Sequence, residues 1–130
     1  MDLRGGVVSL RNAIVWTNTA LQGAELFASN SQSRMTVAYT LLSGTSTPHV
    51  VSASDAVFEW DAGLLTADPL LANVDDLHLK SEYGRWVAPD IWTNDPVSSP
   101  AIDAGDPQVS YGLEPKPNGY RINLGAYGGT

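Results

Sequence analysis

Two stretches of the sequence align at a fixed offset, and this repeat constrains the fold more than any other feature. Residues 12–18 (NAIVWTN) match residues 39–45 (YTLLSGT) when Ile14 is set beside Leu41, an offset of 27 residues (14 to 41). Periods of about 20–50 residues are typical of solenoids, in which each repeat buries its apolar face on the next. The offset matches the length of one coil in a parallel β-helix. It therefore predicts a short stack of parallel strands.

Short segments rich in β-branched and aromatic residues fill the first half of the chain, which favours strands. They are VVSL at 7–10, AIVW at 13–16, MTVAYTLL at 35–42 and VFEW at 57–60. Polar, turn-like stretches separate them. A helical turn competes only at residues 20–28 (ALQGAELFA), where Gly23 favours two short strands instead.

The second half has a different composition. Seven of the twelve Gly and six of the eight Pro lie between residues 84 and 130, which disfavours long helices and central strands. We therefore expect a single all-β domain, residues 1–130, in which residues 1–83 form the coils and residues 84–130 form a turn-rich Gly/Pro cap. A cap of this kind would cover the strand edges and apolar interior at the end of the stack.

Charge and cysteine content limit the kinds of partner and metal site that we expect. The chain has 130 residues, a net charge of −7 and no cysteine, so disulfides and thiolate metal sites are excluded. Its acids concentrate after residue 54, and such a surface repels phosphates and anionic lipids, so we expect neither nucleic acid nor membrane as a partner. We do not expect the first ten residues to form a signal peptide, since they lack a long apolar run.

Several longer motifs resemble a known family. They are GLLTADPLL at 63–71, DLHLKSEYGRW at 76–86, SPAIDAGDP at 99–107 and PNGYRINLGAYGG at 117–129, together with the coil-like segments at 12–20 and 33–45. This set resembles the C-terminal end of bacterial surface proteins with right-handed parallel β-helix repeats. The resemblance implies a short right-handed parallel β-helix and an extracellular or cell-surface location. One departure is Ala101, where that family often has cysteine.

The resemblance leaves three functions open, because the wider fold includes polysaccharide lyases, glycosidases and non-catalytic adhesin or carbohydrate-binding segments. The leading hypothesis is a non-catalytic β-helix scaffold or capping domain with weak affinity for polysaccharide. The second is a fragment of a polysaccharide-acting enzyme whose catalytic coils lie upstream of Met1. The third is a self-associating module, a homo-oligomer that pairs through an open N-terminal end.

No catalytic set is evident in the sequence, so we favour a protein that is not an enzyme. Lyase chemistry on this fold needs a basic residue beside metal-binding acids, and Arg34, Arg85 and Arg121 lie beside no such cluster in the sequence. No G-x-S-x-G motif exposes a serine. His78 alternates with Leu77 and Leu79, which predicts an exposed or edge histidine.

Four aromatic residues are the candidate carbohydrate-binding residues: Trp60, Trp86, Trp92 and Tyr83. Exposed flat rings can stack on sugar rings. The alternative, which we favour from the sequence, is that Trp86 and Trp92 are buried in the cap, because a Gly/Pro-rich segment has few other large apolar groups to bury.

Three aspartates, Asp68, Asp103 and Asp106, are the candidate ligands of a calcium ion, because this cation prefers several carboxylate and carbonyl oxygens. Their spacing does not match an EF-hand or a glycine-rich nonapeptide repeat. Asp before Gly or Pro more often caps a turn through its own side chain, and we favour that interpretation. No other cofactor is expected.

Overall fold

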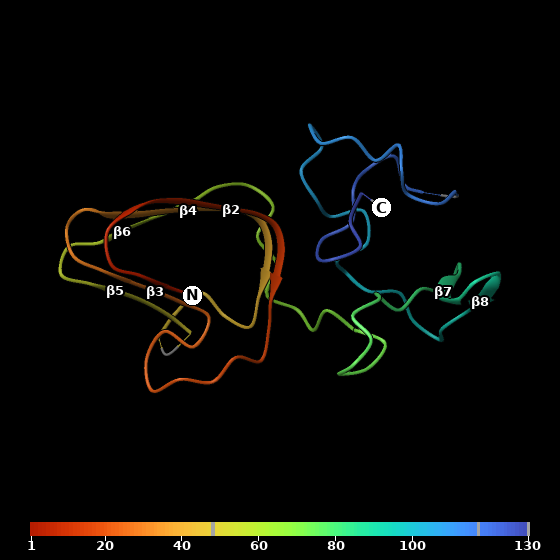
Figure 1. Cartoon of the computed structure of the whole chain (residues 1–130), viewed down its shortest axis with the longest axis horizontal. Helices are drawn as coiled ribbons and strands as arrows, with labels where there is room; N and C mark the ends of the chain where they lie inside the picture. Colours follow the sequence, from red (N-terminus) through yellow and green to blue (C-terminus); the bar gives the residue numbers. More distant parts are fainter. Residues whose placement is uncertain (48, 117, 130) are drawn as a thin grey trace.

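The computed structural model describes residues 1–47, 49–116 and 118–129, and these residues form β-strands but no helix (Figure 1). The strands are β1 Asp2–Leu3, β2 Gly6–Val15, β3 Leu26–Ser29, β4 Ser33–Leu42, β5 Val50–Ala53, β6 Val57–Trp60, β7 Arg85–Ala88 and β8 Ile91–Thr93. Within this part of the chain there is accordingly no helix that could span a membrane. The all-β class predicted from the sequence is confirmed.

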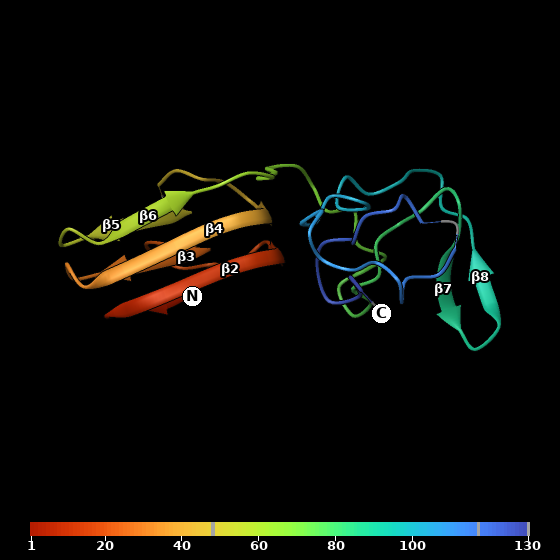
Figure 2. The same ribbon diagram turned by 90° about the horizontal axis from the view of Figure 1, so that it is seen from above.

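The first six strands form two parallel three-stranded sheets, ordered β1–β3–β5 and β2–β4–β6. Each turn of the chain adds one strand to each sheet, and Figure 2 shows the successive turns stacked on one another. Ile14 pairs with Leu41 and Val15 with Leu42, so the predicted offset of 27 residues (14 to 41) is confirmed as the register between β2 and β4. The next step is shorter, at 23 residues from Arg34 to Val57.

A left-handed backbone position bends each of the two long strands. Asn12 in β2 and Tyr39 in β4 occupy equivalent positions in the register and have φ values of 52° and 44°. Gly63, with φ 74°, lies at the matching place in the third turn, since Leu65 pairs with Leu41. Pairing continues across the bend, so segments 7–10 and 13–16, expected as two strands, form one continuous β2.

The bend also shifts which side chains face the interior. Before it, Met35 and Val37 point inward, whereas after it Leu42 points inward and Leu41 outward, because one residue has been added to the alternation. Two apolar cores result. The inner core contains Leu26, Met35, Val37, Leu42 and Val50. The outer core contains Leu41, Ala101 and Leu124, with Ile14 and Leu65 packed against it.

The C-terminal lobe (the described residues from 66 to 129) lies beside the stack (Figures 1 and 2). Its apolar side chains cover the outward column formed by Ile14, Leu41 and Leu65, one residue from each turn. The N–H of Gly125 donates to the carbonyl oxygen of Asn12, 2.9 Å away, in the first turn. The bend thus creates an apolar side face, which the lobe covers. That residues 84–130 cover the end of the stack stays a prediction.

Two aromatic side chains lie at the end of the stack formed by the last turn. Phe58 and Trp60 in β6 are stacked, with ring centroids 5.6 Å apart and an interplanar angle of 11°. Phe58 packs against the inner core, while Trp60 pairs with inward-facing Val37 and is 41% exposed. Both rings lie on β6, the edge strand of the sheet ordered β2–β4–β6.

Candidate functional site

A two-stranded antiparallel ribbon, β7–β8, carries two tryptophans side by side. Trp86 in β7 and Trp92 in β8 are directly opposed in the register, and opposed residues of an antiparallel pair lie on the same face. The strands are joined by the short turn at Pro89 and Asp90, where Asp90 has φ 62°. Both tryptophans are half-exposed, at 40% and 52%.

A partly buried charge network holds the ribbon in place. The guanidinium of Arg85 donates through Nε and one terminal nitrogen to the two carboxylate oxygens of Asp95, at 2.9 and 3.2 Å, and through its other terminal nitrogen to Asp76, at 3.2 Å. Asp95 also accepts the N–H of Ser81. The Arg85 and Asp95 side chains are only 14% and 11% exposed. An isolated two-stranded ribbon is marginally stable, so this bidentate pairing is what we expect to fix its position.

These contacts shift the pKa values of the acids. The hydrogen bonds from Arg85, followed by the N–H of Ser81, hold the pKa of Asp95 below its ordinary value. The side-chain and backbone hydrogen bonds of His78 lower the pKa of Asp76, with a smaller contribution from the charge of Arg85. Both carboxylates are therefore held in the ionised form by partners that lie within the lobe.

His78 links the network to the C-terminal segment. Its Nδ1 lies 2.5 Å from Oδ1 of Asp76, and its ring stacks on Tyr127 with centroids 3.7 Å apart and an interplanar angle of 12°. The Trp86 ring also contacts the imidazole, with its centroid 5.4 Å away and an interplanar angle of 34°. The His78 side chain is only 17% exposed. The prediction of an exposed or edge histidine was wrong because this segment is not a regular strand and two aromatic rings enclose the imidazole.

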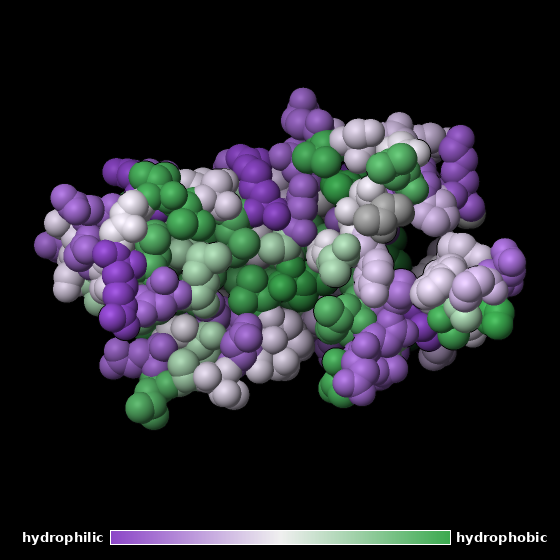
Figure 3. Space-filling view, viewed as in Figure 1, coloured by the Kyte–Doolittle hydropathy of each residue, from purple (hydrophilic) through white to green (hydrophobic). Residues whose placement is uncertain are grey.

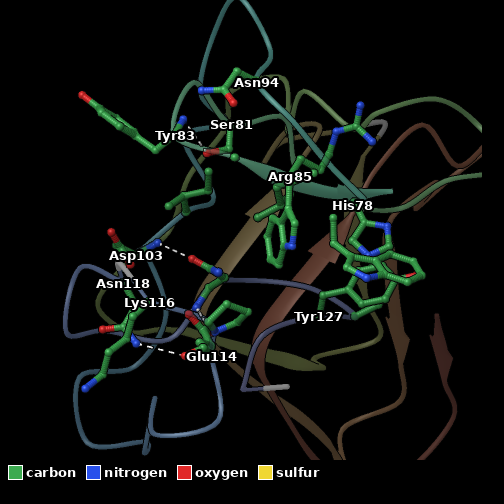
Figure 4. Close-up of a pocket in the computed structure, with 18 residues that line it drawn as sticks. His78, Ser81, Tyr83, Arg85, Asn94, Asp103, Glu114, Lys116, Asn118 and Tyr127 are labelled. Carbon is green, nitrogen blue, oxygen red and sulfur yellow. Dashed lines mark hydrogen bonds between the residues drawn. The ribbon is translucent and has the colours of Figure 1, made fainter. Parts of the chain in front are cut away.

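A pocket of about 780 Å³ opens between the ribbon and the C-terminal loops. Trp86, Trp92 and Tyr127 supply aromatic surface. Figure 4 shows Asp103, Asn118, Lys116 and Glu114 on one side and His78 with Tyr127 on the other. Tyr83 also lines the pocket, but it is 83% exposed and points away from the other labelled side chains (Figure 4). Apolar rings with a few polar groups around them are the usual lining of a small-molecule site.

The two carboxylates of the pocket hold loops together. Oε1 of Glu114, a buried residue, accepts the N–H groups of Asn123 and Gly129 at 2.8 and 2.9 Å. Oδ1 of Asp103 accepts the N–H of Gly119 at 3.1 Å. These bonds keep the pocket wall in shape and leave the second oxygen of Asp103, Oδ2, without a hydrogen-bond partner in the described residues.

The structure brings together three of the four candidate carbohydrate-binding residues. Trp86, Trp92 and Tyr83 line the same pocket, whereas Trp60 lies on β6 in the stack. The favoured alternative, that Trp86 and Trp92 are buried, was wrong, because Leu124 and other aliphatic side chains fill the core of the lobe and the ribbon lies outside it.

The three candidate calcium ligands lie at separate turns. Oδ1 of Asp68 accepts the N–H of Leu70, at 2.8 Å, and Oδ1 of Asp106 accepts the N–H of Gln108, at 2.9 Å. Asp103 lies in the pocket wall. Across residues 1–47, 49–116 and 118–129, no group of three or more His, Cys, Asp or Glu side chains is arranged to hold a metal ion. Asp68 and Asp106 thus make the turn-capping contacts favoured from the sequence, whereas the side chain of Asp103 bonds the N–H of Gly119.

Sequence reasoning missed the network of Arg85 with Asp76 and Asp95. The two acids lie nine residues before and ten residues after the arginine. No helix or strand period brings such positions together, so the only available signal was the presence of one arginine in an acidic segment.

Comparison of the chain with protein-family models, with curated proteins and with solved structures finds no match.

Proposed function

We propose that the protein is a non-catalytic carbohydrate-binding domain built on the coils of a short right-handed parallel β-helix. The observation that carries the proposal is the pair of half-exposed tryptophans, Trp86 and Trp92, in a pocket of about 780 Å³ that also presents carboxylate and amide groups. The β-helix part is supported by three successive turns that each add one strand to two parallel sheets.

The chemistry of the pocket suits a sugar. The face of a pyranose ring is a row of C–H groups, which packs on the flat face of an aromatic side chain, while its edge carries hydroxyl groups that need donors and acceptors. Trp86 and Trp92 provide the flat faces, and Asp103, Asn118 and Lys116 lie across the pocket from His78 and Tyr127 (Figure 4). Leaving two tryptophans half-exposed forgoes burial free energy, and such exposed apolar patches mark interaction sites.

The pocket is also held in position before any ligand arrives. Arg85 fixes the ribbon through Asp95, and the His78 ring stacks on Tyr127. Fixing the wall beforehand reduces the ordering entropy that binding would otherwise have to overcome. The arrangement supports binding rather than catalysis, since Glu114 is occupied in bonding two backbone N–H groups and Asp103 therefore has no second free carboxylate beside it among the described pocket-lining residues.

The test is titration with a panel of soluble oligosaccharides, followed by NMR chemical-shift perturbation and calorimetry. Trp86→Ala and Trp92→Ala should each weaken binding at least about tenfold, roughly 1.4 kcal/mol. Val87→Ala is the matched control, because Val87 is an exposed residue of the same strand that does not line the pocket. Unchanged affinity in both tryptophan variants, or release of reducing sugar by the wild-type protein, would contradict the proposal.

A further inference from the structure

The opening turn of the stack presents an apolar surface. We call this surface the first-coil edge: the outer edge of β2 together with the half-buried side chains Leu3, Val8, Leu10 and Val15. In the part of the chain that the structure describes, no strand pairs with this edge. Outward-facing Val7 is 76% exposed. Figure 3 shows apolar side chains gathered over the centre of the stack in this view along its axis.

We propose that the first-coil edge binds the same edge of a second copy of this chain. The two β2 strands would run antiparallel about a two-fold axis through Ser9. This forms a weak, symmetric dimer and is independent of the proposed sugar site, which lies in the C-terminal lobe. Such self-complementary interfaces are the commonest type in homo-oligomers.

The sequence of β2 suits this register. With Ser9 opposite its own copy, inward-facing Val8 meets the second copy's Leu10, and outward-facing Val7 meets its Arg11. Directly opposed residues of an antiparallel pair share a face, so apolar inward side chains meet apolar inward side chains. The pairing runs from Val7 to Arg11 and stops at the bend of Asn12, where the backbone leaves the strand direction.

Charge distribution favours two first-coil edges meeting. The basic residues on this turn already have acidic partners in their own chain: Arg4 pairs with Asp2 at 2.8 Å, and Arg11 pairs with Asp106 at 2.8 Å. Two such edges can therefore approach without unpaired like charges. The opposite edge, β6, is only four residues long, whereas β2 has ten residues, so β6 offers a second copy fewer backbone groups to pair with.

The position of the lobe favours the antiparallel arrangement over continued stacking. Figure 2 shows the C-terminal lobe beside the stack, at one end of the strands and over the full height of the turns. A copy stacked in the same direction would bring its lobe against the first lobe. An antiparallel copy places the two lobes at opposite ends of the paired strands, where they stay apart.

Sedimentation equilibrium of the wild-type chain should show a monomer–dimer equilibrium. Leu10→Lys inserts a charge into the centre of the interface and should weaken dimerisation at least tenfold, with circular dichroism confirming that the fold persists. Leu113→Lys, at a side chain 79% exposed in the lobe, is the control and should dimerise like the wild type. A wild-type chain that remains monomeric at its highest soluble concentration overturns the proposal.

Disulfide trapping tests the register, since the chain contains no cysteine of its own. Ser9→Cys alone should form a covalent dimer on mild oxidation, because opposed Cα atoms lie about 4.5–5.5 Å apart in antiparallel pairs, within the range of a disulfide. Glu59→Cys alone should not. A covalent dimer that forms only when the Ser9→Cys and Glu59→Cys proteins are mixed would show head-to-tail stacking and overturn the symmetric arrangement.

Discussion

The side-chain oxygen of Asn12 accepts a hydrogen bond from the backbone N–H of Asp106, 2.7 Å away and 94 residues later in the chain. Asn12 has a left-handed backbone, and its main-chain oxygen simultaneously accepts the N–H of Gly125. One residue at the bend of β2 therefore fixes two loops of the C-terminal lobe to the first turn of the stack.

Removing this residue should loosen the lobe from the stack. Asn12→Ala leaves the buried N–H of Asp106 without its acceptor, which costs about 1–3 kcal/mol. It also places a Cβ-bearing residue without local hydrogen bonding at positive φ, at a further cost of about 1–2 kcal/mol. Asn12→Gly also leaves the N–H of Asp106 without its acceptor, but glycine adopts positive φ freely, so this variant carries only the first of the two costs. Urea unfolding should rank the proteins wild type, Asn12→Gly, Asn12→Ala, and equal stability of the two variants would refute the strain argument.

The outer core should contribute as much to stability as an ordinary protein interior. Leu124 is 1% exposed and packs in the same cluster as Leu41 and Ala101. Leu124→Ala should lower the free energy of unfolding by about 2–5 kcal/mol. Leu113→Ala, at an exposed leucine of the same lobe, should change it by less than about 0.5 kcal/mol. A loss at Leu124 no larger than at Leu113 would mean that the lobe and stack do not pack in solution as described.

Arg85 should control the local stability of the ribbon. Lysine cannot form the two parallel bonds that the guanidinium makes to Asp95. Arg85→Lys should therefore speed hydrogen exchange in residues 85–93 by about tenfold, or about 1.4 kcal/mol of local opening free energy. Arg34→Lys is the control, since the Arg34–Glu59 pair is half-exposed in the stack. Unchanged exchange in Arg85→Lys would show that packing alone holds the ribbon.

Stability should fall in acid because of the same network. The pKa values of Asp76 and Asp95 are lowered in the folded protein, so it binds fewer protons than the unfolded chain near their ordinary pKa values of about 4. Their stabilisation is complete above that pH and is lost as pH falls through the lowered values. Asp95→Asn should be less stable at neutral pH and lose less stability between about pH 5 and about pH 3.

The control for the acid experiment is Asp75→Asn, which removes an exposed carboxylate from the same lobe. Unfolding by guanidinium chloride at each pH gives the slope of the free energy of unfolding against pH. Equal slopes in the wild type and Asp95→Asn would contradict the assignment of this acid sensitivity to the Arg85 network.

The stacked part of the fold was predictable because its signal repeats. Ile14 and Leu41 are apolar at equivalent positions since each covers the same column, and that equivalence is visible as an offset in the sequence. The bend was not predictable, because it is formed by an asparagine in one turn and a tyrosine in the next. The second apolar face on the side of the stack was therefore not predictable either, because it results from the bend.

The candidate site was predictable in composition but not in geometry. Trp86 and Trp92 were identifiable as large aromatics in a Gly/Pro-rich segment. Their exposure depends on the ribbon, which forms through the turn at Asp90 and the contact of Arg85 with Asp95. These are contacts between irregular segments, and such contacts leave no periodic trace in a sequence.

A stack of similar turns carries a hazard of its own, since a chain docking on it can slip by one whole turn and still find apolar side chains. The bend positions of the three turns are occupied by different residues: Asn12, Tyr39 and Gly63. Only Asn12 has a side-chain amide oxygen that can accept the N–H of Asp106, so the lobe can distinguish the first turn from the others. The contact at Asn12 thereby sets the position of the lobe along the stack, and the lobe packs as far as Leu65 in the third turn. We expect the contact between Asn12 and Asp106, which joins the lobe to the stack, also to prevent the lobe from docking one turn out of register.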